Sequence, residues 1–163
     1  MRPPRIEPGP GQESVWDYPR PPRTEPTSDL ITVAYGELAI AETTSAIRVL
    51  ETSQPPAHYI PREDIDFAHL LATPGRSYCE WKGEASYYSL NVPSGAVEQV
   101  AWSYAQPNEA FEVITGYVAF YAQKMDCTIA GEAVTANDGT FYGGWITSKV
   151  VGPFKGGPGS AWW

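Results

Sequence analysis

Proline and glycine occur along the whole chain and constrain its fold more than any other feature. Sixteen prolines and fifteen glycines are distributed over 163 residues. Proline fixes φ and lacks a backbone donor, and both residues disfavour helix interiors, so a helical bundle is disfavoured. Short strands joined by many turns fit this distribution. We therefore expect an all-β fold with a minor helical content.

Half of the prolines lie in the first 30 residues, which divides the chain into three regions. We expect an extended proline-rich arm over residues 1–29, an antiparallel β domain over 30–142, and a Gly/Trp-rich tail over 143–163 packed on the domain. A free arm would leave Trp16 and Tyr18 in water, so we expect it to clasp the domain. The alternative is that the arm binds a partner protein. The terminal pair Trp162 and Trp163 is also expected to dock.

Alternating apolar residues predict antiparallel hairpins in the central region. Ile31, Val33 and Tyr35 share one face of a strand, and the dipeptide Gly36-Glu37 follows as a turn. Glycine accepts the positive φ that a type II′ turn requires, and the same dipeptide recurs at residues 83–84 and 131–132. Three hairpins are therefore expected. Further strands are expected at 100–104 and 117–121, single helical turns at 62–65 and 108–111, and a strand or a helical turn at 47–51.

Charge and cysteine content limit the classes of partner and compartment. The net charge is −8, and the arm's arginines (Arg2, Arg5, Arg20 and Arg23) alternate with acidic residues, so we expect no nucleic-acid and no membrane partner. No apolar run is long enough to span a bilayer. Two cysteines cannot form a disulfide framework, and the N-terminus has no apolar signal region. We therefore expect a cytoplasmic protein with free thiols.

Aromatic and reactive side chains are most concentrated between residues 79 and 104. If this segment is a strand, Cys79 and Trp81 point together, as do Glu80 and Lys82. Such rings either fill a core or wall a pocket. A lysine in the run favours a wet or liganded side, because charge is costly in a core. We expect a small-molecule pocket with walls from Trp81, Tyr87 and Trp102 and polar contacts from Glu51, Tyr59 and Lys82.

A second polar group precedes this segment. Arg48 and Glu51 are expected to pair at the surface, and a stiff Pro-Pro loop presents His58 and Tyr59. If Glu51 approaches Lys82, a site of mixed charge lies beside the aromatic wall. Such a site suits a small polar ligand with a cyclic or heterocyclic body.

Enzymatic and scaffolding alternatives stay open. Cys79 is a candidate nucleophile if His58 or His69 lies near it as a base. Asp64 and Asp66 form the only Asp-x-Asp, the type of carboxylate pair that holds Mg²⁺ for nucleotidyl transfer. The arm could instead act as an interaction scaffold. Neither cysteine has a second cysteine at zinc-ligand spacing, so we expect no metal and no cofactor.

Several stretches of the chain resemble the family called domain of unknown function 427, which is also named as a nucleotidyltransferase family. They are Val15–Pro22, Val49–Ser53, Pro55-Pro56, Tyr59–Asp64, Tyr78–Gly83, Ala101–Tyr104 and Phe141–Ser148. The resemblance implies one all-β domain in which two antiparallel sheets meet like a tent, similar to the thalidomide-binding domain of cereblon. It carries over no zinc site, because the paired cysteines of zinc-holding relatives are absent here. It leaves the ligand and the oligomeric state open.

Overall fold

Strands are the main secondary structure of the computed structural model, which describes residues 3–139 and 142–163. Within these residues the helices are three short 3₁₀ segments: η1 (Val15–Asp17), η2 (Arg62–Asp64) and η3 (Glu109–Ile114). The expected all-β class is confirmed, as are the helical turns after Pro61 and Pro107. Arg2 of the arm, and Phe141 at the start of one family-like stretch, lie outside the described residues.

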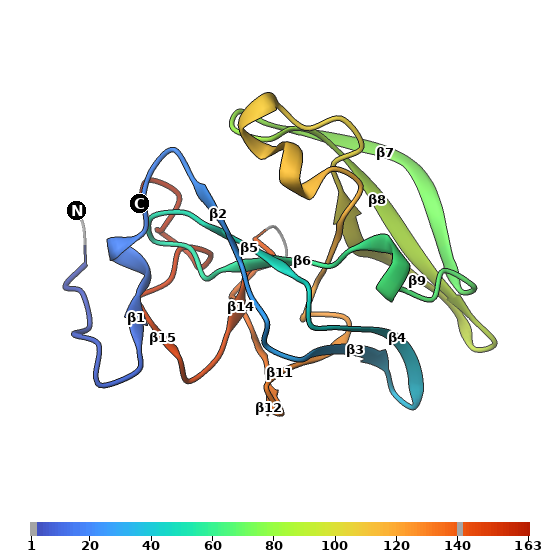
Figure 1. Cartoon of the computed structure of the whole chain (residues 1–163), viewed down its shortest axis with the longest axis horizontal. Coiled ribbons are helices and arrows are strands. Elements are labelled where there is room, and N and C mark those ends of the chain that lie inside the picture. The colour runs from blue at the N-terminus through green and yellow to red at the C-terminus, as the bar shows by residue number, and fades with distance from the viewer. Residues whose placement is uncertain (1–2, 140–141) are drawn as a thin grey trace.

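The longest strands form a four-stranded antiparallel sheet, drawn at the upper right of Figure 1. Its order is β10-β9-β8-β7, with β7 at Leu70–Cys79, β8 at Gly83–Val92, β9 at Gly95–Ser103 and β10 at Val118–Phe120. A second four-stranded sheet has the order β12-β11-β3-β4. Its strands are β3 (Ile31–Tyr35), β4 (Leu38–Thr43), β11 (Asp126–Ile129) and β12 (Glu132–Ala133). The main apolar core, which includes Ile31, Val33, Leu90 and Phe120, draws on both sheets.

A three-stranded sheet joins the arm to the rest of the protein. It has the order β2-β5-β6, with β2 at Arg23–Pro26, β5 at Ile47–Leu50 and β6 at Ala57–Tyr59. The ambiguous segment 47–51 is thus a strand up to Leu50. Two short pairs complete the sheets: parallel β1 (Glu13–Ser14) with β15 (Val150–Val151), and antiparallel β13 (Thr135–Ala136) with β14 (Trp145–Ile146). The tent-like meeting of two sheets stays a prediction.

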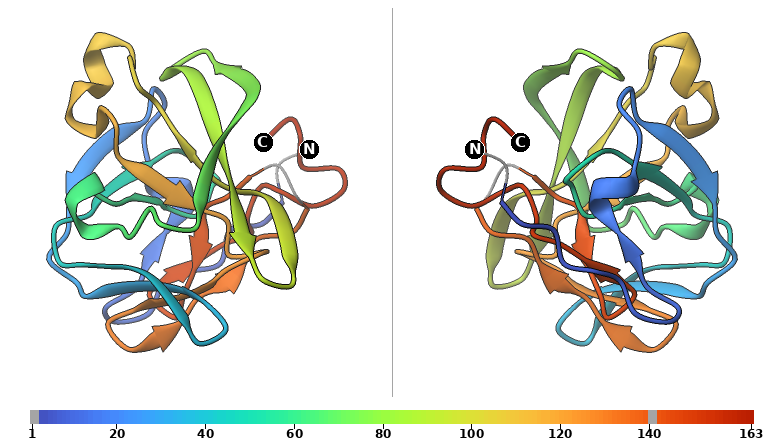
Figure 2. Two further views of the ribbon diagram at one scale, coloured as in Figure 1. Left: turned by 90° about the vertical axis from the view of Figure 1, so that its right-hand side faces the viewer. Right: turned by 90° about the vertical axis from the view of Figure 1, so that its left-hand side faces the viewer.

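The arm and the C-terminal segment lie side by side, as Figure 2 shows. Val15 is fully buried and Tyr18 is buried, so the arm packs into the structure. The tail behaves differently from the expectation for its two terminal rings. Trp163 lies 5.8 Å from Trp16 between ring centroids, but Trp162 is 94% exposed. The prediction that both rings dock is therefore wrong for Trp162.

Two of the three expected turns differ in register from the sequence-based prediction. Gly36-Glu37 is the two-residue turn between β3 and β4, as expected. Between β11 and β12 the turn is Ala130-Gly131, because both residues have positive φ, at 50° and 82°. Between β7 and β8 the turn is 80–82, and Cys79 pairs with Gly83 across the ladder.

The displaced β7–β8 turn has a tertiary cause. Asn108, just before η3, donates its backbone N–H to the Lys82 carbonyl at 2.9 Å and its amide to the Trp81 carbonyl at 3.0 Å. These bonds hold residues 80–82 as a loop against η3. The prediction that Cys79 and Trp81 share a strand face is therefore wrong, since Trp81 belongs to the loop.

Candidate functional site

A cavity of about 320 Å³ lies between the β7–β8 hairpin and the β5–β6 segment. Aromatic side chains from β6, the β7–β8 loop, β8 and β9 line it, together with others that follow β9 and β10. They include Tyr59, Trp81, Tyr87, Trp102, Tyr104 and Tyr121. All six residues predicted to contact a ligand line this one cavity: Glu51, Tyr59, Trp81, Lys82, Tyr87 and Trp102. The candidate nucleophile Cys79 lines it as well.

Strand register explains why these rings face the same space. Tyr87 on β8 is the direct cross-strand partner of Trp102 on β9, so both side chains stand on one face of the sheet. On β6, alternation directs Ala57 and Tyr59 to the cavity. The loop 80–82 reaches the same space from the end of the hairpin. The cavity thus collects residues from distant parts of the chain, from Val49 to Lys155.

The aromatic walls are held together by hydrogen bonds and ring contacts. The Trp102 indole N–H donates to the Tyr59 hydroxyl at 3.0 Å, in an edge-to-face arrangement with centroids 6.0 Å apart. The Trp102 and Tyr121 centroids are 4.6 Å apart. The Tyr87 hydroxyl is hydrogen-bonded to Ser77 Oγ at 2.5 Å. Because these polar atoms are satisfied within the wall, the rings keep a defined arrangement around the cavity.

Gly143 and Gly144 complete the wall, and our sequence reasoning placed them in the tail instead. A Cβ at Gly143 would lie 2.4 Å from the Trp102 ring, and a Cβ at Gly144 would lie 2.1 Å from the Pro55 carbonyl oxygen. The backbone can approach these groups only because neither residue has a side chain. Two consecutive glycines next to Trp145 are the sequence signal for such a close approach.

Charged groups of both signs line the cavity. The Lys82 ammonium lies 5.8 Å from the Tyr104 ring centre, and the Lys155 ammonium lies 5.3 Å from that of Tyr142. Glu51 also lines it, and its side chain is only 14% exposed. The predicted surface pair of Arg48 with Glu51 is wrong: Glu51 pairs with Arg20 at 3.4 Å, while Arg48 pairs with Glu13 and Glu25. The reason is that Arg48 lies on β5 and points to the opposite face of the sheet.

Protonation states follow from burial and from these neighbours. Burial alone lowers the pKa of Lys82, but Tyr59, Cys79 and Glu51 outweigh that effect, so the pKa is raised above 10.5. Burial raises the pKa of Tyr59 above 10.0, against an opposing effect of Lys82. At neutral pH the cavity therefore presents a cationic Lys82 beside an un-ionised Tyr59 hydroxyl.

The groups considered for catalysis are not assembled in the cavity in the predicted way. Asp64 lies in η2, accepts a hydrogen bond from Thr43 Oγ1 at 2.7 Å, and is not among the lining residues. Neither His58 nor His69 lines the cavity, and the ionisable neighbours of Cys79 include Lys82, Tyr59 and Tyr104. In residues 3–139 and 142–163, no three His, Cys, Asp or Glu side chains gather as metal ligands. No helix in the same ranges has the length and apolarity to cross a membrane.

The fold and the cavity define a class: a small protein of several, mostly antiparallel sheets with an aromatic-walled cavity beside its main core. The chain belongs to the family described as a domain of unknown function (DUF427), whose model matches residues 23–131. This confirms the family resemblance. The matched range contains the six predicted contact residues, while Gly143, Gly144 and Lys155 lie beyond it. No curated protein is significantly similar to the chain.

Proposed function

We propose that this protein binds a small planar heterocycle, neutral or anionic, in the aromatic cavity. The observation that supports this is the arrangement of the rings. Aromatic side chains from several strands surround a space of about 320 Å³, and Trp102 and Tyr59 satisfy each other's polar atoms. Cavities of this size with apolar walls and a few polar groups are typical small-molecule sites.

The charges of the cavity favour one type of ligand over another. Aromatic cages often take cations on their ring faces. Here the protein's own ammonium groups lie near two rings, Lys82 by Tyr104 and Lys155 by Tyr142. At these two rings a ligand cation would meet an ammonium group of the protein, whereas a carboxylate or carbonyl oxygen would accept a charge-assisted hydrogen bond from Lys82. Glu51 offers a carboxylate oxygen to an N–H group of the ligand.

A panel of planar heterocycles in matched charge states tests the proposal. Nicotinate, nicotinamide and 1-methylnicotinamide form one such series: anionic, neutral and cationic. We expect the anionic or neutral members to raise the melting temperature and to quench tryptophan fluorescence, and the cationic member to bind most weakly. If no compound in the panel has either effect, or if the cations bind best, the proposal is wrong.

Two pairs of variants separate specific binding from other effects. Trp81→Ala should abolish the quenching, whereas Trp162→Ala should not, because Trp162 is 94% exposed and does not line the cavity. Lys82→Met should reduce the preference for the anion by about tenfold, the value of one charge-assisted hydrogen bond. Lys124→Met, which removes a lysine outside the cavity, should leave that preference unchanged.

A second candidate function is thiol chemistry at Cys79, supported by the position of Cys79 in the same cavity as Lys82. A nearby cation stabilises a thiolate, which is the reactive form. Iodoacetamide labelling tests this candidate, with Cys127 as the internal control, because burial raises the pKa of Cys127 to about 12. Alkylation of Cys79 faster than that of free cysteine supports the candidate, and alkylation at the same rate or slower contradicts it.

A further inference from the structure

A second cavity, of about 290 Å³, lies on the other face of the β2-β5-β6 sheet. The two cavities share no lining residue, although they use adjacent positions of the same strands. Val49 and Ala57 line the aromatic cavity, whereas Arg48 and His58, which are cross-strand partners, line the second one. Alternation along a strand places neighbouring residues on opposite faces, so one pair of strands serves both cavities.

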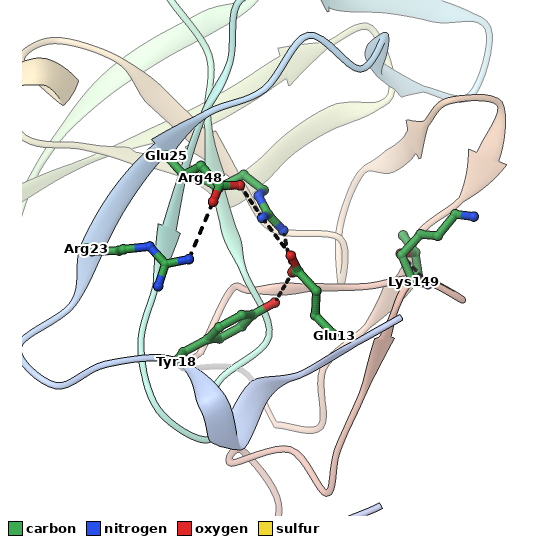
Figure 3. Close-up of polar contacts among 7 residues, drawn as sticks. Glu13, Tyr18, Arg23, Glu25, Arg48 and Lys149 are labelled. Atoms are coloured by element: carbon green, nitrogen blue, oxygen red, sulfur yellow. Dashed lines mark hydrogen bonds and ion pairs between the residues drawn. The ribbon is translucent and has the colours of Figure 1, made fainter. Parts of the chain in front are cut away.

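The largely buried cation of this second cavity is neutralised by the protein itself (Figure 3). Arg48, whose side chain is 15% exposed, bonds Glu13 from β1 at 3.0 Å and also pairs with Glu25 from β2. Arg23 lies 3.4 Å from Glu25, and the Tyr18 hydroxyl donates to Glu13 at 2.7 Å. Arg48 therefore needs no anionic ligand.

The two lysines that line the aromatic cavity have no such partner. Lys82 and Lys155 are both half-buried, and neither forms a salt bridge with any described residue. Glu51 acts on Lys82 without a salt bridge to it, and its carboxylate lies 3.4 Å from Arg20. The other lining carboxylate, Glu80, is exposed. Because an unpaired charge is costly away from water, these lysines indicate anionic groups that the described residues do not supply.

The two ammonium groups reach the cavity from different segments and lie beside different rings. Lys82 belongs to the β7–β8 loop, and its ammonium group lies 5.8 Å from the Tyr104 ring centre, with Cys79 as a hydrogen-bonding neighbour. Lys155 belongs to the C-terminal segment, and its ammonium group lies 5.3 Å from the centre of the Tyr142 ring, which also lines the cavity. An ammonium group has three donors, so each lysine can bond oxygen atoms of a ligand. The cavity therefore offers two positions for anionic groups.

The segment that carries Lys155 is fixed against the rest of the protein. The Lys155 N–H donates to the Ser53 carbonyl at 2.7 Å, and the Asn137 amide donates to the Lys155 carbonyl at 2.7 Å. The next residue, Gly156, packs so closely that a Cβ there would lie 2.6 Å from the Asn137 amide nitrogen. Lys155 is thus presented to the cavity from a held backbone and not from a free tail.

We propose that the ligand of the aromatic cavity is a planar heterocycle with two separate carboxylate groups. One carboxylate accepts hydrogen bonds from Lys82 and the other from Lys155, while the ligand ring packs between the aromatic side chains. A volume of about 320 Å³ admits a molecule of this size. This inference rests on the function proposed above and makes it more specific, since that function requires at most one negative charge.

Nicotinate and the pyridine dicarboxylates that contain it provide the test. A second carboxylate at each free ring carbon of nicotinate gives quinolinate, cinchomeronate, dinicotinate and isocinchomeronate, in which the two carboxylates are separated differently. Isothermal titration calorimetry at neutral pH and fixed ionic strength should give at least one of these isomers an affinity about tenfold above that of nicotinate. If nicotinate binds and no isomer binds more tightly, this inference is overturned and the proposed function stands. If neither nicotinate nor nicotinamide nor any isomer binds, the proposed function fails with it.

Two lysine variants separate a specific contact from a general effect of charge. Lys155→Met should weaken binding of the preferred isomer about tenfold, to the level of nicotinate, and should leave nicotinate within about twofold. The contacts that hold Lys155 come from its backbone, so the melting temperature of the free variant should stay the same.

Lys149→Met is the matched control for this charge change. It removes a lysine of the same C-terminal segment, but Lys149 is exposed and lines the second cavity, near the Arg48 network in Figure 3. It should leave both affinities unchanged. If Lys155→Met keeps the difference between the isomer and nicotinate, or if Lys149→Met also removes it, the inference is overturned.

Discussion

The two faces of the β2-β5-β6 sheet carry cavities of opposite character. One face has Val49, Ala57 and Tyr59 and continues into a wall of aromatic rings. The other has Arg48 and His58 and continues into a network of ion pairs. Neither face of this small sheet is simply covered by a continuous apolar layer. Side chains alternate between the two faces of a strand, so the consecutive residues Ala57, His58 and Tyr59 line two different cavities.

The two cavities also differ in how their polar groups are satisfied. On the aromatic face the wall satisfies itself, through the bond from the Trp102 indole to the Tyr59 hydroxyl. On the charged face the counter-charges for Arg48 come from the arm, through Glu13 and Glu25. The arm thus supplies the carboxylates of the charged face, and its ion pairs with Arg48 help to hold it against the domain. Five predictions test this contrast.

The largest effect is expected where a new side chain meets backbone at the wall of the aromatic cavity. In Gly144→Ala the new Cβ would lie 2.1 Å from a backbone oxygen of Pro55, which cannot move as a side chain would. We expect a loss of about 3 kcal/mol in the free energy of unfolding, measured by urea denaturation. Gly75→Ala is the control, because its Cβ meets open space, and it should change stability by less than about 0.5 kcal/mol.

Arg48→Met breaks only the charged face. It leaves Glu13 without its cation and Glu25 with Arg23 alone, and we expect a loss of about 2 kcal/mol at neutral pH, below the cost for a fully buried pair because both carboxylates keep some water contact. The near-ultraviolet circular dichroism of the aromatic wall should stay the same. A changed aromatic spectrum would show that the two faces are not independent.

The same variant should have a distinctive pH dependence. The Arg48 guanidinium, opposed by burial, lowers the pKa of Glu13 below 4.5. The stability that Glu13 contributes is therefore present above pH 4.5 and is lost as the pH falls through the folded-state pKa. The stability difference between the wild type and Arg48→Met should narrow in acid. A constant difference would contradict this origin.

His58 gives a pH signal of its own. Burial, with a further effect of Arg48, lowers the pKa of His58 from 6.5 to about 3. The unfolded chain takes up a proton below pH 6.5 that folded His58 does not, so stability should fall as the pH falls below that value. The slope should approach about 1.4 kcal/mol per pH unit. His58→Gln should remove this slope, and His69→Gln should retain it.

Tyr59→Phe should have the smallest effect and should be confined to the aromatic face. It leaves the buried Trp102 N–H without an acceptor, which should cost about 1 kcal/mol. Denaturant unfolding measures the loss, and Tyr78→Phe is the control because Tyr78 is 75% exposed. The His58 nitrogen resonances should not change, since His58 faces the other cavity. A shift there would show that the faces are coupled.

The residues of the aromatic site could be predicted because their types are unusual for a core. A lysine and a glutamate close to several tryptophans and tyrosines indicated a cavity instead of a filled interior, and the structure brings Glu51, Lys82 and Trp102 to one cavity. The reasoning about local geometry was less successful. Trp81 reaches the cavity from a loop held by Asn108, and not from a strand as expected. That loop depends on a contact between distant segments, which strand alternation does not predict.

The charged face was missed for a related reason. Arg48 was matched with the nearest acidic residue in the chain, Glu51, whereas its partners are Glu13 and Glu25. The pair with Glu25 exists because β2 lies beside β5, and the pair with Glu13 exists because β1 of the arm packs near Arg48. Likewise, Gly143 and Gly144 are recognisable as wall residues only once Trp102 and Pro55 lie against them.

The amino-acid sequence alone predicted the all-β class and six of the residues that line the aromatic cavity, and its resemblance to a family over several stretches predicted the family. The fold class and the six residues depend on residue types and on a two-residue period, which are local properties of the chain. Tertiary structure alone decided the turn at 80–82, the partners of Arg48 and the second cavity behind His58. Each of these depends on which distant strands become neighbours, and that is set by packing over the whole molecule.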